Sequence, residues 1–297
     1  MTLEEFRESL QAEREFRNLD DWTFQAVGGG GASAHTHRLR SAHADYFVKE
    51  AKDNERDALK LIGPLELRHV ERVIYPGLLD QNILVTDYIT GGPIQSKDLE
   101  PGLIRDFATI QNHVGRPKST DHLPASDEVG LDQHALRCFE QGYANVSALE
   151  QHGFDIATSC RKVADHLMDR REEIVGEHSA MPEAWQHHDF REANILGRDP
   201  QKIVDWGSSY GLGPFLFDMA PFIFNHEGNR RAFLAHSEIC RQADASAVER
   251  WIYAATCVRF MEFLRYSVRH LVTSADREGA AEILAYHYHT YGGLLRE

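Results

Sequence analysis

The stretch that decides the fold is residues 185–209, which read WQHHDFREANILGRDPQKIVDWGSS. It contains an H-x-D-x-x-x-x-N pattern that begins at His187, and Asp205 follows Asn194 farther along the chain. Asp189 opens a loop whose turn is expected to bring Asn194 back beside it. The segments NIL and IVD predict a short hairpin that delivers Asp205 to the same place. Three oxygen-bearing side chains would then converge on one point.

These three side chains match the needs of one kind of chemistry. Phosphoryl transfer from a nucleotide requires a carboxylate that orients the attacking hydroxyl and accepts its proton, together with oxygen ligands for magnesium. Asp189, Asn194 and Asp205 supply that set. The sequence therefore indicates magnesium-dependent phosphoryl transfer.

The residues before this stretch alternate in the manner of strands. Charged residues among Leu3, Phe6, Leu10 and Phe16 predict a short amphipathic helix over residues 3–16. Strands are expected at 22–27, 36–40 and 45–51, then at 71–79 (ERVIYPGLL) and 82–89 (NILVTDYI), and a helix is expected at 54–62. Five strands and a helix would make a small antiparallel lobe.

From Gly102 onward the apolar periods are mainly helical. Helices are expected at 133–151, 158–176, 247–272 and 279–292, with residues 185–209 as an island of strand and loop between them. Gly91, Gly92 and Pro93 place the boundary near residue 90. The prediction is an α+β fold of two lobes, in which residues 1–90 form a small sheet lobe and residues 91–297 a larger, mainly helical lobe.

Charge and composition limit the classes of partner. A formal net charge of -14 disfavours a non-specific grip on nucleic acid and would attract cationic small molecules, although surface acid also serves solubility. The four cysteines form no C-x-x-C pair, which favours reduced thiols in a cytoplasm. The first residues are too charged for a signal peptide, and no apolar run approaches the ~20 residues that span a bilayer. We expect a cytoplasmic protein without membrane or nucleic-acid partners.

The motifs in residues 185–220 resemble those of the aminoglycoside phosphotransferase and choline-kinase-like family, relatives of protein kinases. That family has H-G-D-x-x-x-x-N followed by I-D-W or I-D-F, and the similarity extends over roughly residues 22–225. The resemblance implies ATP as the donor and a hydroxyl of a small molecule as the acceptor. It also implies a five-stranded lobe above a helical one.

The resemblance also implies roles for single residues. Asp189 would be the base, and Asn194 and Asp205 the magnesium ligands. Lys49 would reach the phosphates of ATP, with Glu55 on the next helix holding its ammonium group in place. We expect the charge of Lys49 to matter for phosphate binding and much less for folding. Two supporting roles complete the set, with His187 orienting the catalytic loop by hydrogen bonding and Asp218 bracing it.

Two further segments are expected to contact the nucleotide. The glycine run at 28–31 lets backbone amides approach phosphate, which makes Gly29, Gly30 and Ser33 candidates for covering it. The strand at 82–89 would lead to the hinge, with the backbone of Thr86, Asp87 and Tyr88 facing the adenine. A flexible hairpin and a buried strand explain the same two segments without a nucleotide.

The chain departs from the family pattern inside the loop. His188 replaces the family glycine, and Arg191-Glu192-Ala193 replaces the usual His-Pro-Gly. Neither change removes a magnesium ligand, and Arg191 joins the candidates for a supporting role. Both changes leave the subclass of acceptor open.

Several functions remain open on the sequence alone. The acceptor is expected to be cationic or polyhydroxylated, with aminoglycosides first and amino alcohols such as choline, sugars or amino sugars as alternatives. A nucleotide-binding pseudokinase that acts as an interaction module is a second class. A metal-dependent hydrolase that uses His187, His188 and Asp189 is a third class, although no second cluster stands at a structural-zinc spacing.

Overall fold

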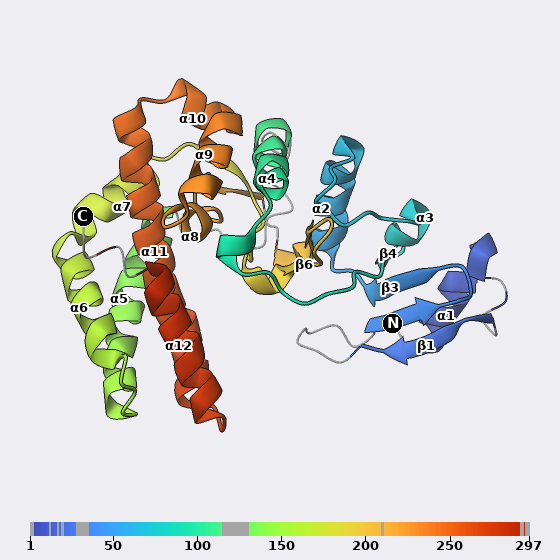
Figure 1. Cartoon of the computed structure of the whole chain (residues 1–297), viewed down its shortest axis with the longest axis horizontal. Helices are drawn as coiled ribbons and strands as arrows, with labels where there is room; N and C mark the ends of the chain where they lie inside the picture. The colour runs from blue at the N-terminus through green and yellow to red at the C-terminus, as the bar shows by residue number, and fades with distance from the viewer. Residues whose placement is uncertain are drawn as a thin grey trace. The chain divides into compact units, whose positions relative to one another are not determined.

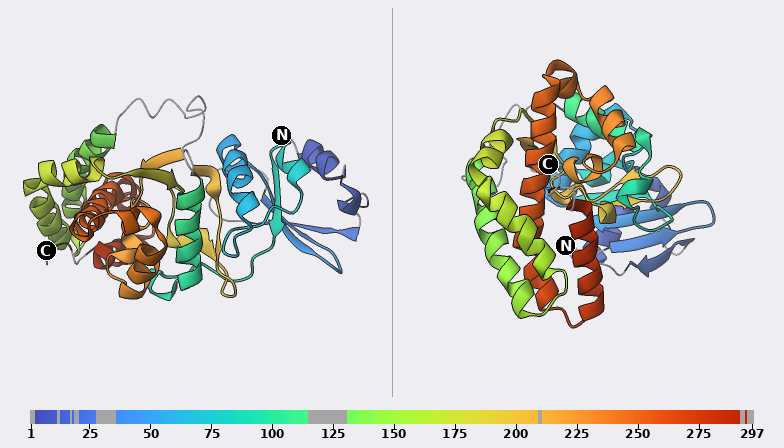
Figure 2. Two further views of the ribbon diagram at one scale, coloured as in Figure 1. Left: turned by 90° about the horizontal axis from the view of Figure 1, so that it is seen from above. Right: turned by 60° about the vertical axis from the view of Figure 1, so that its left-hand side comes forward.

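The computed structural model describes residues 3–11, 13–16, 18, 21–27, 36–114, 131–208, 211–291 and 294. The chain separates into two compact units (Figures 1 and 2). The first contains residues 1–110 and 187–210, and the second contains residues 111–186 and 211–297. The predicted catalytic stretch therefore belongs to the same unit as the N-terminal sheet. The division into lobes at residue 90 stays a prediction.

The sheet of the first unit is antiparallel, with the order β1-β2-β3-β4 (Figure 1, blue to blue-green). Its strands are β1 (Thr23–Ala26), β2 (Thr36–Arg40), β3 (Asp45–Glu50) and β4 (Ile83–Asp87). The predicted N-terminal helix is helix α1 (Leu3–Gln11) and a separate 3-10 turn, η1 (Arg14–Phe16). In the register between β3 and β4, Lys49 lies opposite Leu84.

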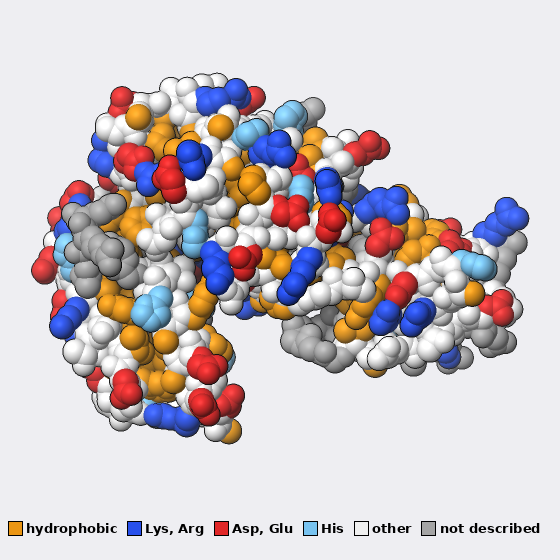
Figure 3. Space-filling view, in the orientation of Figure 1, with side chains coloured by type: hydrophobic (Ala, Val, Ile, Leu, Met, Phe, Trp, Pro, Cys, Tyr) orange, Lys and Arg blue, Asp and Glu red, His pale blue; other side chains and the backbone are white. Residues whose placement is uncertain are grey.

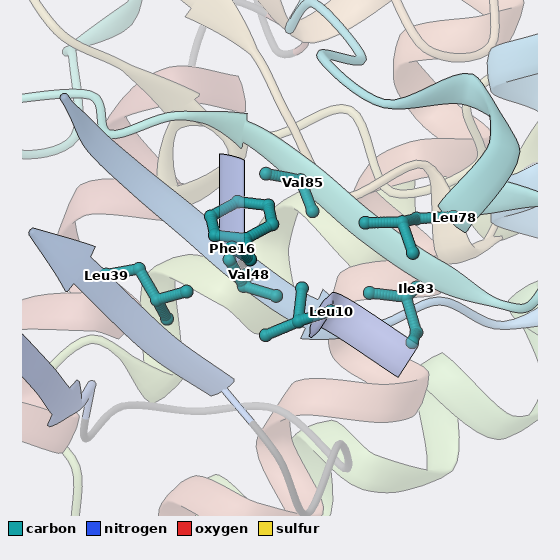
Figure 4. Close-up of a cluster of buried hydrophobic side chains, with 7 residues drawn as sticks. All are labelled: Leu10, Phe16, Leu39, Val48, Leu78, Ile83 and Val85. Atoms are coloured by element: carbon teal, nitrogen blue, oxygen red, sulfur yellow. The ribbon is translucent and has the colours of Figure 1, made fainter. Parts of the chain in front are cut away.

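One face of this sheet carries the core of the first unit (Figure 4). The core cluster consists of Leu10, Phe16, Leu39, Val48, Leu78, Ile83 and Val85, all of them buried. Successive side chains of a strand point to opposite faces. Because Val48 points into this cluster, Lys49 points to the other face of the sheet. The alternation of β3 thus selects the face on which the site forms.

Helix α2 (Asp53–Ile62) follows β3, as the sequence predicts. Glu55 is buried on it together with the apolar residues Ala58, Leu59 and Ile62. The 3-10 turn η3 (Gly63–Leu65) ends the helix, because Pro64 cannot donate a helical hydrogen bond. The buried face of α2 therefore carries the carboxylate of Glu55 among apolar side chains.

The expected strand at 71–79 is wrong. Val73 forms only an isolated bridge with Thr86, and residues Pro76–Leu79 form the short helix α3. Pro76 lacks a backbone N–H and its fixed φ suits the first turn of a helix, which is where it stands. Among the described residues the sheet has four strands and not the five that were expected.

The predicted hairpin after Asn194 is confirmed. Strand β6 (Ile195–Leu196) pairs antiparallel with β7 (Lys202–Ile203), and short 3-10 turns lie on either side, η6 (Glu192–Asn194) and η7 (Trp206–Ser208). Farther back in the chain are η4 (Ser96–Asp98) and α4 (Pro101–His113). The hairpin places Asp205 directly after β7.

The second unit is mainly helical (Figure 2). Its long helix α11 (Ala245–Val272) packs against α5 (Leu131–Gln151), α7 (Arg171–Ser179) and α12 (Arg277–Tyr291). The single helix expected at 158–176 is two, α6 (Ala157–Asp169) and α7, which break at Arg170. The remaining elements are β5 (Glu183–Gln186), β8 (Gly211–Pro214), α8 (Ala220–Ile223), α9 (Glu227–His236) and α10 (Glu238–Gln242).

Two expectations for the whole chain concern membrane spans and the cysteines. Within the described part of the chain, no helix has the length and apolar character that a membrane span requires. All four cysteines are free thiols. On the face seen in Figure 3, Lys and Arg are interspersed with Asp and Glu.

Candidate active site

Lys49 is the centre of a buried charge cluster in the first unit. Its Nζ lies 2.6 Å from Glu55 Oε1 and 3.1 Å from Asp205 Oδ1. Only 9% of Lys49 and 2% of Glu55 is exposed. The structure thus brings together three residues that the sequence separated by up to 156 positions.

The electrostatics of this cluster are dominated by burial and mutual attraction. Burial opposes the charged form of Lys49, but Glu55, Glu71 and Asp205 together raise its pKa above the usual value. Burial raises the pKa of Asp205, and the attraction and hydrogen bond of Lys49 outweigh that effect, so the pKa is lowered. Lys49 is therefore a cation and Asp205 an anion at neutral pH.

The catalytic loop orients its own polar groups. Asn194 Nδ2 donates to the backbone oxygen of Asp189 at 2.8 Å and to its Oδ2 at 2.9 Å. With the amide nitrogen used in this way, Asn194 Oδ1 is the atom left for a metal ion. Arg191 Nε lies 3.1 Å from Asp189 Oδ1, and the Arg191 side chain is exposed.

His187 fixes the start of this loop. Its Nε2 donates to Val204 O at 3.0 Å, and its Nδ1 accepts from the Asp189 N–H at 3.3 Å. Its ring also lies 4.5 Å from that of Trp206. His188, which replaces the family glycine, has φ +62°. That left-handed conformation is one that glycine adopts without strain and that residues with a side chain disfavour.

Glu192 anchors the loop at the position where the family that the motifs resemble has proline. Its Oε1 accepts from the Ser96 backbone N–H and, at 2.6 Å, from Ser96 Oγ. Ile94 N also donates to Ile195 O at 3.1 Å. The unusual Arg-Glu-Ala sequence therefore ties the catalytic loop to residues 94–96.

Glu71 is the site residue that sequence reasoning missed. It is 7% exposed, and it accepts a hydrogen bond from the Asp205 backbone N–H. Burial and the neighbouring carboxylates raise its pKa to about 8, against the opposing effect of Lys49. No local pattern indicates Glu71, because it falls within a segment expected to be a strand and its partner lies 134 positions later.

The residues expected to face adenine form strand pairs or hydrogen bonds within the sheet or at its edge. Thr86 is buried and pairs with Phe47. The Asp87 carboxylate accepts from Arg72 at 3.3 Å, and the Tyr88 N–H donates to Asp45 O at 2.9 Å. Their adenine contact stays a prediction. Gly29, Gly30 and Ser33 lie outside the described residues.

Asp218 lies in the second unit. It is fully buried, and its backbone N–H is 3.4 Å from Gln186 Oε1. Arg259 belongs to the same unit, its side chain is 14% exposed, and the charge of Asp218 contributes to raising the pKa of its guanidinium. The role of Asp218 as a brace for the catalytic loop stays a prediction.

Three acidic residues of the second unit, which could contribute to attracting a cationic acceptor, are paired with arginines. Glu227 lies 3.6 Å from Arg231, and Glu238 lies 3.8 Å from Arg241. Glu262 pairs with Arg259. This pairing weakens the argument from net charge, because each carboxylate is at least partly neutralised.

Two groups of side chains can be tested for a fit to a metal ion. Asn194 and Asp205 offer an amide oxygen and a carboxylate near Asp189, a hard-oxygen set that fits Mg²⁺. His134, Cys138 and Glu262 also have donor atoms within 4.8 Å of one another. Arg259 pairs with Glu262, however, and Arg265 Nη1 lies 3.8 Å from Cys138 Sγ. Two of the three candidate ligands therefore already face an arginine, which disfavours a zinc ion at this place.

The chain is similar in structure to several kinases of small molecules. An AMP-bound spectinomycin phosphotransferase matches with a TM-score of 0.64 and 13% identity over 99% of this chain and 98% of the other, and the same enzyme is known with ADP and spectinomycin. A choline kinase from Cryptosporidium parvum has a TM-score of 0.56 and 13% identity over 99% and 97%. An ethanolamine kinase from Plasmodium vivax has a TM-score of 0.53 and 14% identity over 95% and 84%.

No family model and no curated protein matches the sequence. At such low identities the structural similarity shows the fold, which is the protein-kinase-like fold expected from residues 185–220.

Proposed function

We propose that this chain is an ATP-dependent, magnesium-requiring kinase that transfers the γ-phosphoryl group to a hydroxyl of a small molecule. The observation that carries this proposal is the convergence of Lys49, Glu55 and Asp205 within the unit that also holds Asp189 and Asn194. The fold supports it, because similar structures are kinases of spectinomycin, choline and ethanolamine.

Each residue of the site would have a distinct task. Lys49, held by Glu55, would bind the α- and β-phosphates of ATP, and Asp189 would align the acceptor hydroxyl and receive its proton. Asn194 Oδ1 and the Asp205 carboxylate would hold magnesium, which neutralises phosphate charge when bound. Arg191, exposed beside Asp189, would lie where the transferred group approaches. Positioning and electrostatic stabilisation would account for catalysis.

A metal-ligand variant tests the nucleotide site. Asp205→Ala should weaken ATP binding in the presence of Mg²⁺ by about tenfold or more, because a charged hard-oxygen ligand is lost. Binding is measured by calorimetry with and without Mg²⁺. Asp199→Ala is the matched control, since Asp199 is exposed between β6 and β7 of the same hairpin and pairs only with exposed Arg68 among the described residues. Equal ATP affinity in Asp205→Ala and the parent would contradict the metal assignment.

The acceptor is proposed to carry a cationic or amino group. Choline and ethanolamine, the acceptors named for two similar proteins, both have a cationic nitrogen, and the net charge of -14 favours such molecules at a distance. Acceptor-dependent ADP formation should therefore be greater with aminoglycosides and amino alcohols than with neutral sugars. A screen that returned only neutral or anionic acceptors would contradict this preference.

A further inference from the structure

We propose that Glu71 is a positioning residue of the active site, which holds the backbone of Asp205 in the conformation that presents its carboxylate to magnesium. The assignment rests on the proposed function. The geometry behind it lies entirely within the first unit, in residues 67–72 and 202–206.

The backbone of Asp205 needs such a support. Its φ is +61°, in the left-handed region that side chains disfavour. A residue holds this conformation only where its surroundings fix it. On one side, Val204 N donates to Asn194 O at 3.0 Å, which joins the segment to the catalytic loop. On the other side, the Asp205 N–H donates to the Glu71 carboxylate.

Glu71 is itself firmly placed beside β7. Val70 forms a parallel bridge with Ile203, and Ile203 N donates to His69 O at 2.8 Å. Glu71 N in turn donates to Ile203 O at 3.2 Å, and Lys202 Nζ donates to Val70 O at 3.0 Å. This short ladder fixes the main chain of Glu71, so its side chain reaches forward to the amide two residues farther along.

Glu71 is buried, and this burial indicates that its side chain has a specific contact to make. A carboxyl group that is only 7% exposed is costly to bury unless its oxygens are hydrogen-bonded. Glu71 also lies close enough to raise the pKa of Lys49, which is already paired with Glu55 and Asp205. Its second acceptor atom, Oε1, has no hydrogen-bond partner among the described residues. The Glu71 side chain is thus oriented by the amide of Asp205, the residue whose carboxylate would contact magnesium.

Two substitutions separate the hydrogen bond from the charge. Glu71→Gln retains an oxygen that can accept from the Asp205 N–H, whereas Glu71→Leu has a similar volume and no acceptor. His69→Ala is the structural control, because it removes a buried side chain from the same segment that contacts Asp106 at 2.8 Å and Glu100 at 3.0 Å, away from the phosphate site. All variants are compared below their melting temperatures.

The readouts are the Mg²⁺ concentration that half-saturates ATP binding and the hydrogen exchange of the Asp205 amide. Glu71→Leu should raise the half-saturating Mg²⁺ concentration and the amide exchange rate by about tenfold each, because the amide loses its acceptor. Glu71→Gln should stay within about twofold of the parent in both readouts. His69→Ala should melt earlier and keep the parental Mg²⁺ dependence.

The possible failures are distinguishable. Parental Mg²⁺ dependence and exchange in Glu71→Leu would overturn the assignment of Glu71 while leaving the proposed function intact. Equal defects in Glu71→Gln and Glu71→Leu would overturn it too, because the charge and not the hydrogen bond would then matter. A parent protein without Mg²⁺-dependent ATP binding would overturn the proposed function and this assignment with it.

Discussion

Asp189→Asn is expected to bind ATP as the parent does and to turn over about 10²–10⁴-fold more slowly, the usual contribution of a general base. The substitution keeps the shape of the side chain and an oxygen that can accept from Asn194 Nδ2, which lies 2.9 Å from Asp189 Oδ2. It removes the negative charge and the proton acceptor. A loose phosphoryl-transfer transition state demands little of the nucleophile, so a carboxylate that takes the proton late is sufficient.

The experiment compares the dissociation constant for ATP and kcat in Asp189→Asn and the parent. Asp57→Asn, an exposed position on α2, is the control and should change neither value. Because the transfer is expected in one step, denatured protein should retain no ³²P after incubation with γ-labelled ATP. A kcat close to the parental value would contradict the role of Asp189, and a label that chases into product would indicate a covalent mechanism.

Lys49→Met should abolish most activity and also lower the stability of the protein. The sequence suggested that this charge would matter little for folding, but the structure changes that expectation. Lys49 is nearly buried and neutralises Glu55 and Asp205, with Glu71 close enough to raise its pKa. Removing one partner of a buried ion pair typically costs about 3–5 kcal/mol, because the remaining charges stay buried without compensation.

The measurement is denaturant unfolding beside ATP binding at a temperature where the variant is folded. Lys60→Met is the matched control, since Lys60 is half-exposed on α2 and pairs with exposed Asp80. An exposed pair of this kind contributes about 1 kcal/mol or less. A Lys49→Met protein with parental stability would show that the buried carboxylates are not balanced by Lys49, and parental activity would exclude a role in phosphate binding.

Local patterns in the sequence predicted the elements that local rules determine. The alternation in β3, the helix that carries Glu55 and the hairpin before Asp205 all follow from short-range periodicity and turn residues. The segment ERVIYPGLL misled because its β-branched residues suit a strand, whereas Pro76 begins a helix there. Apolar composition alone does not distinguish a strand from a helix when the segment contains a proline.

Site residues that belong to one compact motif could be predicted from the sequence. Site residues that the fold brings together from distant segments could not. Asp189, Asn194 and Asp205 stand within 17 residues of one another, so their convergence could be inferred from the loop and hairpin. Glu71 reaches Asp205 only because residues 67–72 run beside β7, a pairing between distant segments that no local pattern records. The burial of Lys49 was missed for the same reason, since its three carboxylate neighbours come from three separate segments.

The measurement that tests the central claim most directly is transfer of label from γ-³²P ATP in a screen of aminoglycosides, amino alcohols, sugars and nucleosides, with Mg²⁺ and with a chelator. The proposed kinase should label at least one hydroxyl-bearing acceptor when Mg²⁺ is present. Chelation should stop the transfer, and Asp189→Asn should reduce it by about 10²-fold or more. ATP that binds but is never consumed with any acceptor, or transfer that persists undiminished in the chelator, would contradict the account.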